Sequence, residues 1–509
     1  MNGSRNRRWW ALAGLLIAVL TVGFDITIMN VALPTIATEL KAGTAQLQWM
    51  VNAYVLVLAG LMLVCGALGD RYGRKRLLLI GLALFAASSA AAAWAGDAGA
   101  VIAARAVMGV GAAILLPVVF ALLPVLFEPQ ERGRAVSLTV MGVGIGIPLG
   151  PILGGWLLDH FWWGSIFLIN VPMAVLAMAA LAILLPESRD LTPRRPDLPG
   201  AVLSTAGLLC LAYGLIEAPG RGWSDPVVST ALVTGIVLIA GFIGWERRTR
   251  DPMIALGLFA QRRFLGGSLA GVLVTFGMLG LLFVIPQYLQ LVSGHDAFGT
   301  GLRLLPMIAG LVVGAPLGER AAAALGYRVP VPAGLLILAA ALAIGASTGI
   351  ASGYGFVAAW LAAAGFGIGL ALSPAMDAVL SDLPPEHAGS GTAITMTLRQ
   401  VGGVLGVALL GSVLAQGYTD RLDVTGLPGP ATDTARESLA GGLAVAGQLG
   451  RPELADAARL AYLHGMTLVL LTTAAVAVLS AVVVAALIGG RPAHDTAADS
   501  PSATVRTHK

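Results

Sequence analysis

Two charged side chains lie inside apolar runs that are long enough to cross a lipid bilayer, where they could carry chemistry. Asp25 lies in the run that starts near Trp9, and Arg105 lies in the run that starts near Val101. Burial disfavours the charged form of a carboxyl group, so Asp25 can bind and release a proton near neutral pH. It can also pair with a cationic ligand. The structural alternative is a carboxylate held by a neighbouring hydroxyl group or by Arg105 for packing alone.

Arg105 has two interpretations, and the sequence leaves both open. A buried arginine needs an acid or a carbonyl partner, and Asp25 is the obvious candidate. Because Arg105 lies only a few residues into its run, its side chain can instead extend to the outer surface of the bilayer.

The segment from Gly66 to Arg76 joins the second and third apolar runs and combines glycines, one acid and several bases. Its glycines allow a tight turn and a close approach of helices. Asp70 can cap the N-terminus of a helix or pair with an arginine. A positive anchor at the membrane surface is the simpler interpretation, but it does not explain the spacing of glycines, acid and bases together.

The fifth apolar run is rich in glycine and proline. It contains Gly142, Gly144, Gly146 and Pro148, followed by Gly150–Gly155 with Pro151. Glycines open a helix face to a neighbouring helix, and prolines kink the helix. The run is not a dinucleotide loop, because no strand precedes it, and no lysine follows a glycine run as in a phosphate-binding loop. This pattern favours secondary transport over an ATP-driven pump.

The composition requires a membrane around these runs. The chain has 509 residues, of which 57% are hydrophobic and 11% charged, whereas soluble domains carry roughly 25% charged residues. An ordinary cytosolic enzyme, a disordered chain and a nucleic-acid binder are therefore excluded. The apolar runs do not alternate, which indicates helices. About fourteen runs reach the roughly 20 residues of a spanning helix, beginning near Trp9, Leu47, Leu77, Val101, Ala135, Ser165, Gly200, Pro226, Phe264, Gly301, Arg328, Gly355, Gly391 and Gly465.

The basic residues predict the orientation. Most arginines and lysines fall in alternate connections, on the side of the N-terminus, which places both termini in the cytoplasm. A loop at 417–463 then lies outside, with a short surface helix expected at Pro452–Arg459, and the polar tail 489–509 is expected to be disordered. Cys65 and Cys210 lie in apolar runs and are expected to be packing residues.

Together these motifs resemble the major facilitator superfamily, and within it the fourteen-span drug:proton antiporters of the EmrB/QacA type. Asp25–Pro34 is similar to the first-helix signature, Gly66–Arg76 to the loop motif, Arg105–Gly111 to the fourth-helix motif and Gly150–Gly155 to the antiporter motif. Further segments match sequence patterns of the group, namely Pro286–Gln290, Gly389–Thr392 and Arg399–Gly403. The similarity covers Trp9 to Ile488.

The resemblance implies an all-α polytopic membrane protein with the major facilitator fold. Two six-helix bundles, at 9–188 and 262–488, would flank two additional transmembrane helices at 198–248. It also implies a monomer in the bacterial cell membrane, which exports hydrophobic or cationic drugs, antibiotics or secondary metabolites by alternating access. Its partners would be that small substrate and the lipid bilayer, with no nucleic acid. A proton would be the coupling ion, with no other cofactor and no metal.

The resemblance also assigns roles to residues. Asp25 would be the proton and cation site, with Arg105 as its modulator. Asp70 and Arg74 would latch the cytoplasmic side by docking near Gly391, and Gly150 and Pro151 would shape the interface between bundles. Candidates for the cavity wall, each of which can instead bond between helices, are Asn30, Asn52, Tyr54, Gln287, Tyr288, Gln290, Met396 and Arg399.

The second half of the chain offers only Asp377 and Glu319 as acids within its apolar runs, both near predicted cytoplasmic ends. Asp377 can face the mouth of the cavity, although a plain helix-end charge is the simpler interpretation. A cationic substrate is therefore not required.

Two other functions are considered. An importer or facilitator of a small polar solute would be expected to carry more polar anchors, and the fifth-run pattern weighs against it. A membrane enzyme or scaffold is the more remote alternative. The six histidines are scattered, and no metal-ligand cluster, Ser/His/Asp set or cysteine nucleophile stands out.

Overall fold

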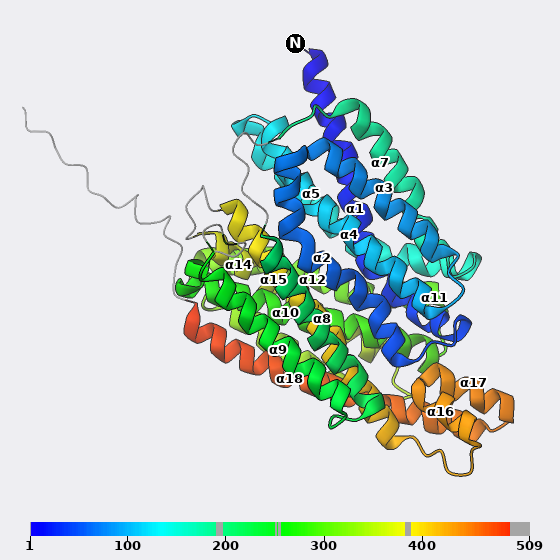
Figure 1. Cartoon of the computed structure of the whole chain (residues 1–509). Helices are drawn as coiled ribbons and strands as arrows, with labels where there is room; N and C mark the ends of the chain where they lie inside the picture. The colour runs from blue at the N-terminus through cyan, green and yellow to red at the C-terminus, as the bar shows by residue number, and fades with distance from the viewer. Residues whose placement is uncertain (1, 190–196, 250–251, 253–255, 382–387, 489–509) are drawn as a thin grey trace, which may run out of the picture.

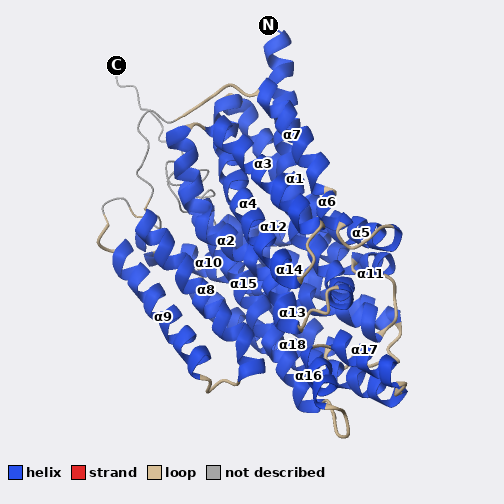
Figure 2. Cartoon of the chain, turned by 45° about the vertical axis from the view of Figure 1, so that its right-hand side comes forward, coloured by secondary structure: helices blue, strands red, loops and turns tan. Residues whose placement is uncertain are grey.

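The computed structural model describes residues 2–189, 197–249, 252, 256–381 and 388–488. Over these residues the chain forms helices joined by turns and loops, with no strand (Figures 1 and 2). The helices run up and down along one bundle. We call the end of the bundle at which α1 begins the N-end, and the opposite end the far end.

The first helices form one packed group. Here α1 packs against α5 and α7, α2 packs against α4, and α3 packs against α4 and α7. The bounds are α1 (Asn2–Glu39), α2 (Thr44–Tyr72), α3 (Arg74–Ala93), α4 (Ala98–Leu126), α5 (Pro129–His160), α6 (Ser165–Leu168) and α7 (Asn170–Leu184).

The run that starts at Ser165 is one candidate span, as expected, and within it the chain forms two consecutive helices, α6 and α7. Pro172 has no amide hydrogen to donate to the carbonyl of Leu168, four residues earlier, and this interrupts the helical hydrogen bonding. The break places Asn170 at the start of α7, where its side chain is buried.

Two helices follow that lie at the edge of the molecule in Figure 2. They pack against each other, and α8 also contacts α2 and α15. Large apolar side chains of α9 are exposed, including Val233, Ile236 and Val237, which suits a lipid-facing helix. The bounds are α8 (Leu198–Arg221) and α9 (Pro226–Glu246), followed by the short 3₁₀ helix η1 (Leu256–Ala260).

The remaining helices form a second packed group. Here α12 packs against α14, α10 against α14, α15 and α18, and α13 against α14 and α18. The bounds are α10 (Arg262–Gln287), the π-helical turn η2 (Tyr288–Val292), α11 (Ala297–Arg303), α12 (Leu305–Leu325), α13 (Pro330–Gly345), α14 (Tyr354–Ser381), α15 (Ala388–Arg421), α16 (Gly429–Glu437), α17 (Leu439–Leu449) and α18 (Pro452–Leu487).

Twelve helices, or pairs of consecutive helices, among the described residues are long and apolar enough to cross a membrane. Two further helices do not meet that measure. α13 has only 16 residues, and α5 has 32 residues but includes positions whose side chains the structure does not describe. The chain is therefore a multi-pass membrane protein, as its composition predicts.

The connection between α15 and α18 is more ordered than the sequence indicated. The expected surface helix at Pro452–Arg459 is the first part of α18, which continues to Leu487. The helices α16 and α17 lie at the far end (Figure 1). The hydroxyl of Tyr418 donates to the carbonyl of Ala435 at 2.8 Å, and the hydroxyl of Thr44 on α2 donates to the carbonyl of Glu437 at 2.9 Å. Hydropathy over a spanning length misses these helices because α16 has 9 residues and α17 has 11, far fewer than a spanning helix needs.

Candidate functional site

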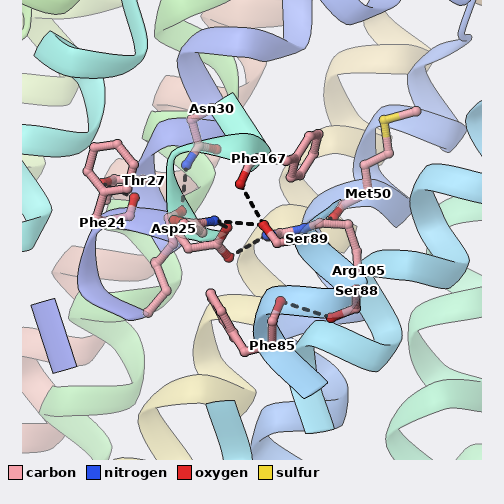
Figure 3. A network of polar contacts seen from close by, with 12 residues as sticks. Phe24, Asp25, Thr27, Asn30, Met50, Phe85, Ser88, Ser89, Arg105 and Phe167 are labelled. Carbon is pink, nitrogen blue, oxygen red and sulfur yellow. Dashed lines mark hydrogen bonds and ion pairs between the residues drawn. The ribbon is translucent and has the colours of Figure 1, made fainter. Parts of the chain in front are cut away.

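A buried polar cluster lies among four helices of the first group (Figure 3). It consists of Asp25 on α1, Ser89 on α3, Arg105 on α4 and Asn170 on α7. The side chain of Asp25 is 0% exposed and that of Arg105 is 1% exposed. Ionisable side chains are rare within membrane-spanning helices and mark pathways for substrates, ions or protons.

Asp25, Arg105, Ser89 and the amide nitrogen of Asn170 each have a defined partner. Nη1 of Arg105 forms an ion pair and hydrogen bond with Oδ2 of Asp25. Nδ2 of Asn170 donates to Oδ1 of Asp25 at 3.1 Å and to Oγ of Ser89 at 3.1 Å. Ser89 in turn donates to the carbonyl of Phe167 at 2.8 Å. Both carboxylate oxygens of Asp25 therefore accept hydrogen bonds, and the cluster joins four helices.

Arg105 is held from a fifth helix as well. Its Nε donates to the carbonyl of Met50 on α2 at 3.0 Å, and its guanidinium carbon lies 4.4 Å from the ring centre of Tyr54. Interaction of a cation with an aromatic face strengthens when water is excluded. The guanidinium group therefore remains attached to α2 whether or not Asp25 carries charge. The interpretation in which Arg105 extends to the outer surface was wrong, because α4 is rotated so that this side chain points into the group.

Several buried polar atoms of the first group of helices have no hydrogen-bond partner within the described part of the chain. They include the hydroxyl of Tyr54, both amide atoms of Asn52 and Oδ1 of Asn170. Buried polar groups in native proteins are nearly always hydrogen-bonded, to protein or to ordered water. Such atoms can bind ordered water or a polar group of a ligand, and of these residues Tyr54 lies beside Arg105.

Asn170 and Ser89 were not expected from the sequence. Asn170 lies in the apolar stretch Ser165–Met173, and Ser89 lies in the third run. Asn30 and Asn52 were selected as amide side chains within apolar runs, and Asn170 meets the same criterion. Serine is common in spanning helices, where it bonds to its own backbone, and gives no comparable signal.

The other predicted cavity residues have contacts of their own, and none has a described contact with Asp25 or Arg105. Asn30 donates to the carbonyl of Ile26 at 3.2 Å and Gln287 to that of Phe283 at 2.8 Å, each within one helix. Gln290 donates to the carbonyl of Val31 at 2.8 Å and thereby joins η2 to α1. Tyr288 donates to the carbonyl of Gly349 at 3.2 Å, and Met396 is half-buried.

Arg399 is half-buried on α15. Its Nε donates to the hydroxyl of Thr275 on α10 at 3.3 Å, and its aliphatic stem lies against Gly271. No described carboxylate forms an ion pair with Arg399. Its environment therefore differs from that of Arg105, although both arginines lie within spanning helices.

The turn between α2 and α3 carries the predicted charge cluster at the N-end. Arg74 pairs with Asp70 through Nε at 2.8 Å and Nη2 at 2.7 Å. Gly73 has φ 112°, which only glycine adopts without strain. A carboxylate oxygen of Glu187 accepts from the amide of Lys75 at 3.1 Å. These contacts hold the turn against the end of α7. The surroundings of Gly391 are not among the described features, so docking there stays a prediction.

Glycines of α5 bring three helices into close contact. A Cβ on Gly146 would lie 2.8 Å from the backbone nitrogen of Phe24 on α1, closer than side chains approach, and Gly150 faces Thr27 and Phe24 in the same way. On the other side, Gly301 of α11 lies against the backbone of Pro151. The glycine-proline run therefore joins α1 to α5 and α5 to the second group of helices.

The two acids of the second group lie near the N-end and are exposed. Oδ2 of Asp377 accepts from the hydroxyl of Tyr327 at 2.7 Å, and Oε1 of Glu319 accepts from the hydroxyl of Ser373 at 2.5 Å. Both contacts join neighbouring helices. The structure thus favours the helix-end interpretation of Asp377 over a place deep in a cavity.

Comparison with known proteins agrees with this architecture. The family profile of the Major Facilitator Superfamily matches residues 15–407. The chain is 33% identical over 494 residues to the tetracenomycin C resistance and export protein of Streptomyces glaucescens, covering 95% of this chain and 92% of that protein. It is 35% identical over 497 residues to the multidrug efflux pump LfrA of Mycolicibacterium smegmatis, covering 95% and 96%.

The fold is also that of solved transporters. A bacterial homologue of the human lysosomal transporter Spinster, in an inward-facing and unoccupied conformation, superimposes with a TM-score of 0.67 at 17% identity, covering 95% of this chain and 99% of that one. These matches exclude the enzyme alternative. The chain belongs to the major facilitator superfamily and is a transporter.

Proposed function

We propose that this transporter exports lipophilic drugs, antibiotics or secondary metabolites from a bacterial cell, in exchange for protons. Two relatives that match nearly the whole chain are named for drug efflux or for resistance to and export of an antibiotic. The observation that carries the coupling is the ion pair of Asp25 and Arg105, buried among five helices.

The chemistry of the cluster supports proton coupling. When Asp25 is ionised, its charge is compensated by Arg105, and the hydrogen bonds of Asn170 hold α1 against α7 and α3. When Asp25 binds a proton, the ion pair ends and Arg105 keeps the carbonyl of Met50 and the ring of Tyr54. The protonation state of one carboxyl group thus changes how firmly α1 is held to its neighbours, which is the bias a two-state transporter needs.

Contacts between the two groups of helices support an inward-open state. Nε2 of Gln48 on α2 donates to the carbonyls of Val407 and Ala408 on α15 at 3.0 Å and 2.9 Å. The close approach of Gly301 to Pro151 joins α11 to α5. All these residues lie toward the far end, which would be the external face. The substrate would then enter from the N-end.

The topology completes the proposal. If α5 and α13 also cross the membrane, the chain has fourteen spans and both termini lie on one side, which the arginine distribution assigns to the cytoplasm. With that count, the chain would consist of two six-helix bundles, at 9–188 and 262–488, and the additional pair of helices at 198–248.

The pairs Asp70–Arg74 and Gly150–Pro151 would act in gating. The protein would work as a monomer without a cofactor other than the proton.

The ion pair also bears on the substrate. Because Arg105 already compensates the charge of Asp25, the site does not require a cationic ligand. The unpartnered amide of Asn52 and hydroxyl of Tyr54 suit a neutral compound with a few polar groups. Uncharged or weakly basic antibiotics therefore fit as well as cations.

The test compares dye export by cells that express the wild type, Asp25→Asn or Asp377→Asn. Asparagine keeps the size of aspartate but cannot titrate. We expect the wild type and Asp377→Asn to lower the accumulation of a lipophilic dye until a proton uncoupler is added, and Asp25→Asn to behave as the uncoupled wild type does.

Each part of the proposal can fail separately. Normal, uncoupler-sensitive export by Asp25→Asn would show that the proton binds elsewhere. Export that the uncoupler leaves unchanged in the wild type would exclude proton coupling. Equal amounts of each variant in the membrane, and equal melting temperatures of Asp377→Asn and the wild type, serve as controls.

A further inference from the structure

A cavity of about 510 Å³ opens at the N-end, away from the buried polar cluster. Its polar lining comes from the start of α10 and from the turn between α12 and α13, and the end of α18 supplies its apolar wall. The lining residues are Gln261, Arg262, Arg263, Arg328 and 485–488. Three arginines from two separate segments thus face one space.

Two of these arginines, Arg262 and Arg328, give the cavity a positive charge. Arg262 and Arg328 are exposed, and no described carboxylate lies within ion-pairing distance of either guanidinium group. The helices α10 and α13 also begin here, at Arg262 and Pro330, and their N-termini add to the positive potential. Guanidinium groups bind phosphate oxygens through paired hydrogen bonds. The ligand chemistry that matches is therefore a phosphate ester.

The walls of the cavity are held in place by packing. A Cβ on Gly266 would lie 2.6 Å from Cγ1 of Ile488, so the start of α10 lies directly against the end of α18. Arg328 follows Tyr327, whose buried hydroxyl donates to Asp377 at 2.7 Å. Gly326 turns the chain there with φ 79°. The site therefore does not need to form around its ligand.

The surroundings of the cavity indicate a lipid. The helices α13 and α18 pack against each other and leave apolar side chains exposed, among them Leu336 (48%) and Val482 (63%). Both lie roughly 8–9 Å from the helix end at the cavity, at about 1.5 Å per residue. Acyl chains can lie along this apolar surface while a headgroup phosphate lies between the arginines. Basic pockets between spanning helices at the cytoplasmic face bind anionic headgroups in this way.

The chain's own C-terminal tail, residues 489–509, fits the cavity less well than an anionic headgroup does. It follows Ile488, which lines the cavity, but it contains Arg491, Arg506 and Lys509 against only Asp495 and Asp499. A segment with more basic than acidic side chains does not complement three arginines. We propose that Arg262, Arg263 and Arg328 form a binding site for the headgroup of an anionic phospholipid, with its acyl chains along α13 and α18.

The test is native mass spectrometry of the full chain in detergent, with phosphatidylglycerol or phosphatidylcholine added at equal concentration. We expect the wild type to retain one bound molecule of phosphatidylglycerol, and to bind phosphatidylcholine more weakly. The double variant Arg262→Gln, Arg328→Gln should weaken that binding roughly 30-fold, if each arginine contributes as basic residues at membrane surfaces do.

A matched control is available at the same end. Arg247 and Arg248 are exposed and follow α9, outside the cavity, so Arg247→Gln, Arg248→Gln removes the same charge and should keep the lipid. Equal loss in both double variants would overturn the site, because general surface charge would then suffice. Displacement of the lipid by glycerol phosphate at a similar concentration would overturn the lipid assignment in favour of a soluble phosphate. Retention of the lipid only after deletion of 489–509 would assign the cavity to the tail.

Discussion

Each of the two groups of helices contains an arginine within a spanning helix, and the two arginines differ in burial and in their polar partners. In the first group, Arg105 is 1% exposed and pairs with a carboxylate that is itself hydrogen-bonded by Asn170. In the second group, Arg399 is half-buried, and the one polar partner it has among the described residues is the neutral hydroxyl of Thr275. The first arrangement compensates charge and joins helices, whereas the second leaves the positive charge without a described acidic partner. From this difference we propose that the first group carries the proton coupling and that Arg399 in the second group contacts an acidic substrate.

The largest loss of stability is expected when the buried carboxylate of Asp25 loses its cationic partner. Arg105→Leu removes the guanidinium group and leaves Asp25 with Asn170 as its described partner. Breaking a buried ion pair from one side costs about 3–5 kcal/mol, because the remaining charge is not compensated. Thermal unfolding of the purified protein in detergent measures the loss.

The charge-neutral double variant Asp25→Asn, Arg105→Gln tests whether charge is the cause. It keeps side chains of similar size and can hydrogen-bond without carrying charge, so it should recover most of the stability while remaining unable to couple protons. A double variant as unstable as Arg105→Leu would mean that packing, and not the uncompensated charge, accounts for the loss.

A smaller effect is expected at Asn170. Its side-chain amide bonds to both Asp25 and Ser89, so Asn170→Ala should lower the free energy of unfolding by about 1–3 kcal/mol. The matched variant Asn30→Ala removes an amide that bonds only to its own helix and should cost less. If the two substitutions cost the same, the cluster does not join α7 to α1 as its geometry indicates.

The sequence was sufficient for the fold and for half of the cluster. Asp25 and Arg105 stand out because charges within apolar runs are rare, and the order of motifs identifies the superfamily. The sequence left their pairing open, because rotation of a helix about its axis depends on packing over its whole length. Asn170 was missed although it lies in an apolar run, since its role depends on the break between α6 and α7 that Pro172 introduces.

The order of the connection between α15 and α18 could not be predicted for a related reason. Hydropathy over a spanning length cannot detect helices as short as α16 and α17, and α16 is fixed by contacts of Tyr418 and Thr44 with distant carbonyls. Likewise, the cavity at Arg262, Arg263 and Arg328 combines segments that are far apart in the chain. Local sequence patterns do not encode such distances.

The smallest effect on stability is expected at Arg399. Because its side chain is half-buried and its described polar partner is one neutral hydroxyl at 3.3 Å, Arg399→Gln should change the free energy of unfolding by about 1 kcal/mol or less. Its effect on transport should be larger. A hydrogen bond from a charged group contributes about 1.5–3 kcal/mol, so export of a lipophilic acid should show a KM raised about tenfold or more.

Two controls separate substrate contact from a general defect. Export of a neutral dye by Arg399→Gln should keep the KM of the wild type, because no charge is recognised. Arg303→Gln removes another half-buried arginine, which bonds to the carbonyl of Gly299 in its own helix, and it should leave the KM for both dyes unchanged. A loss of neutral-dye export equal to the loss of acid export would assign Arg399 to packing against Gly271 and Thr275, and the contrast with Arg105 would then be one of burial alone.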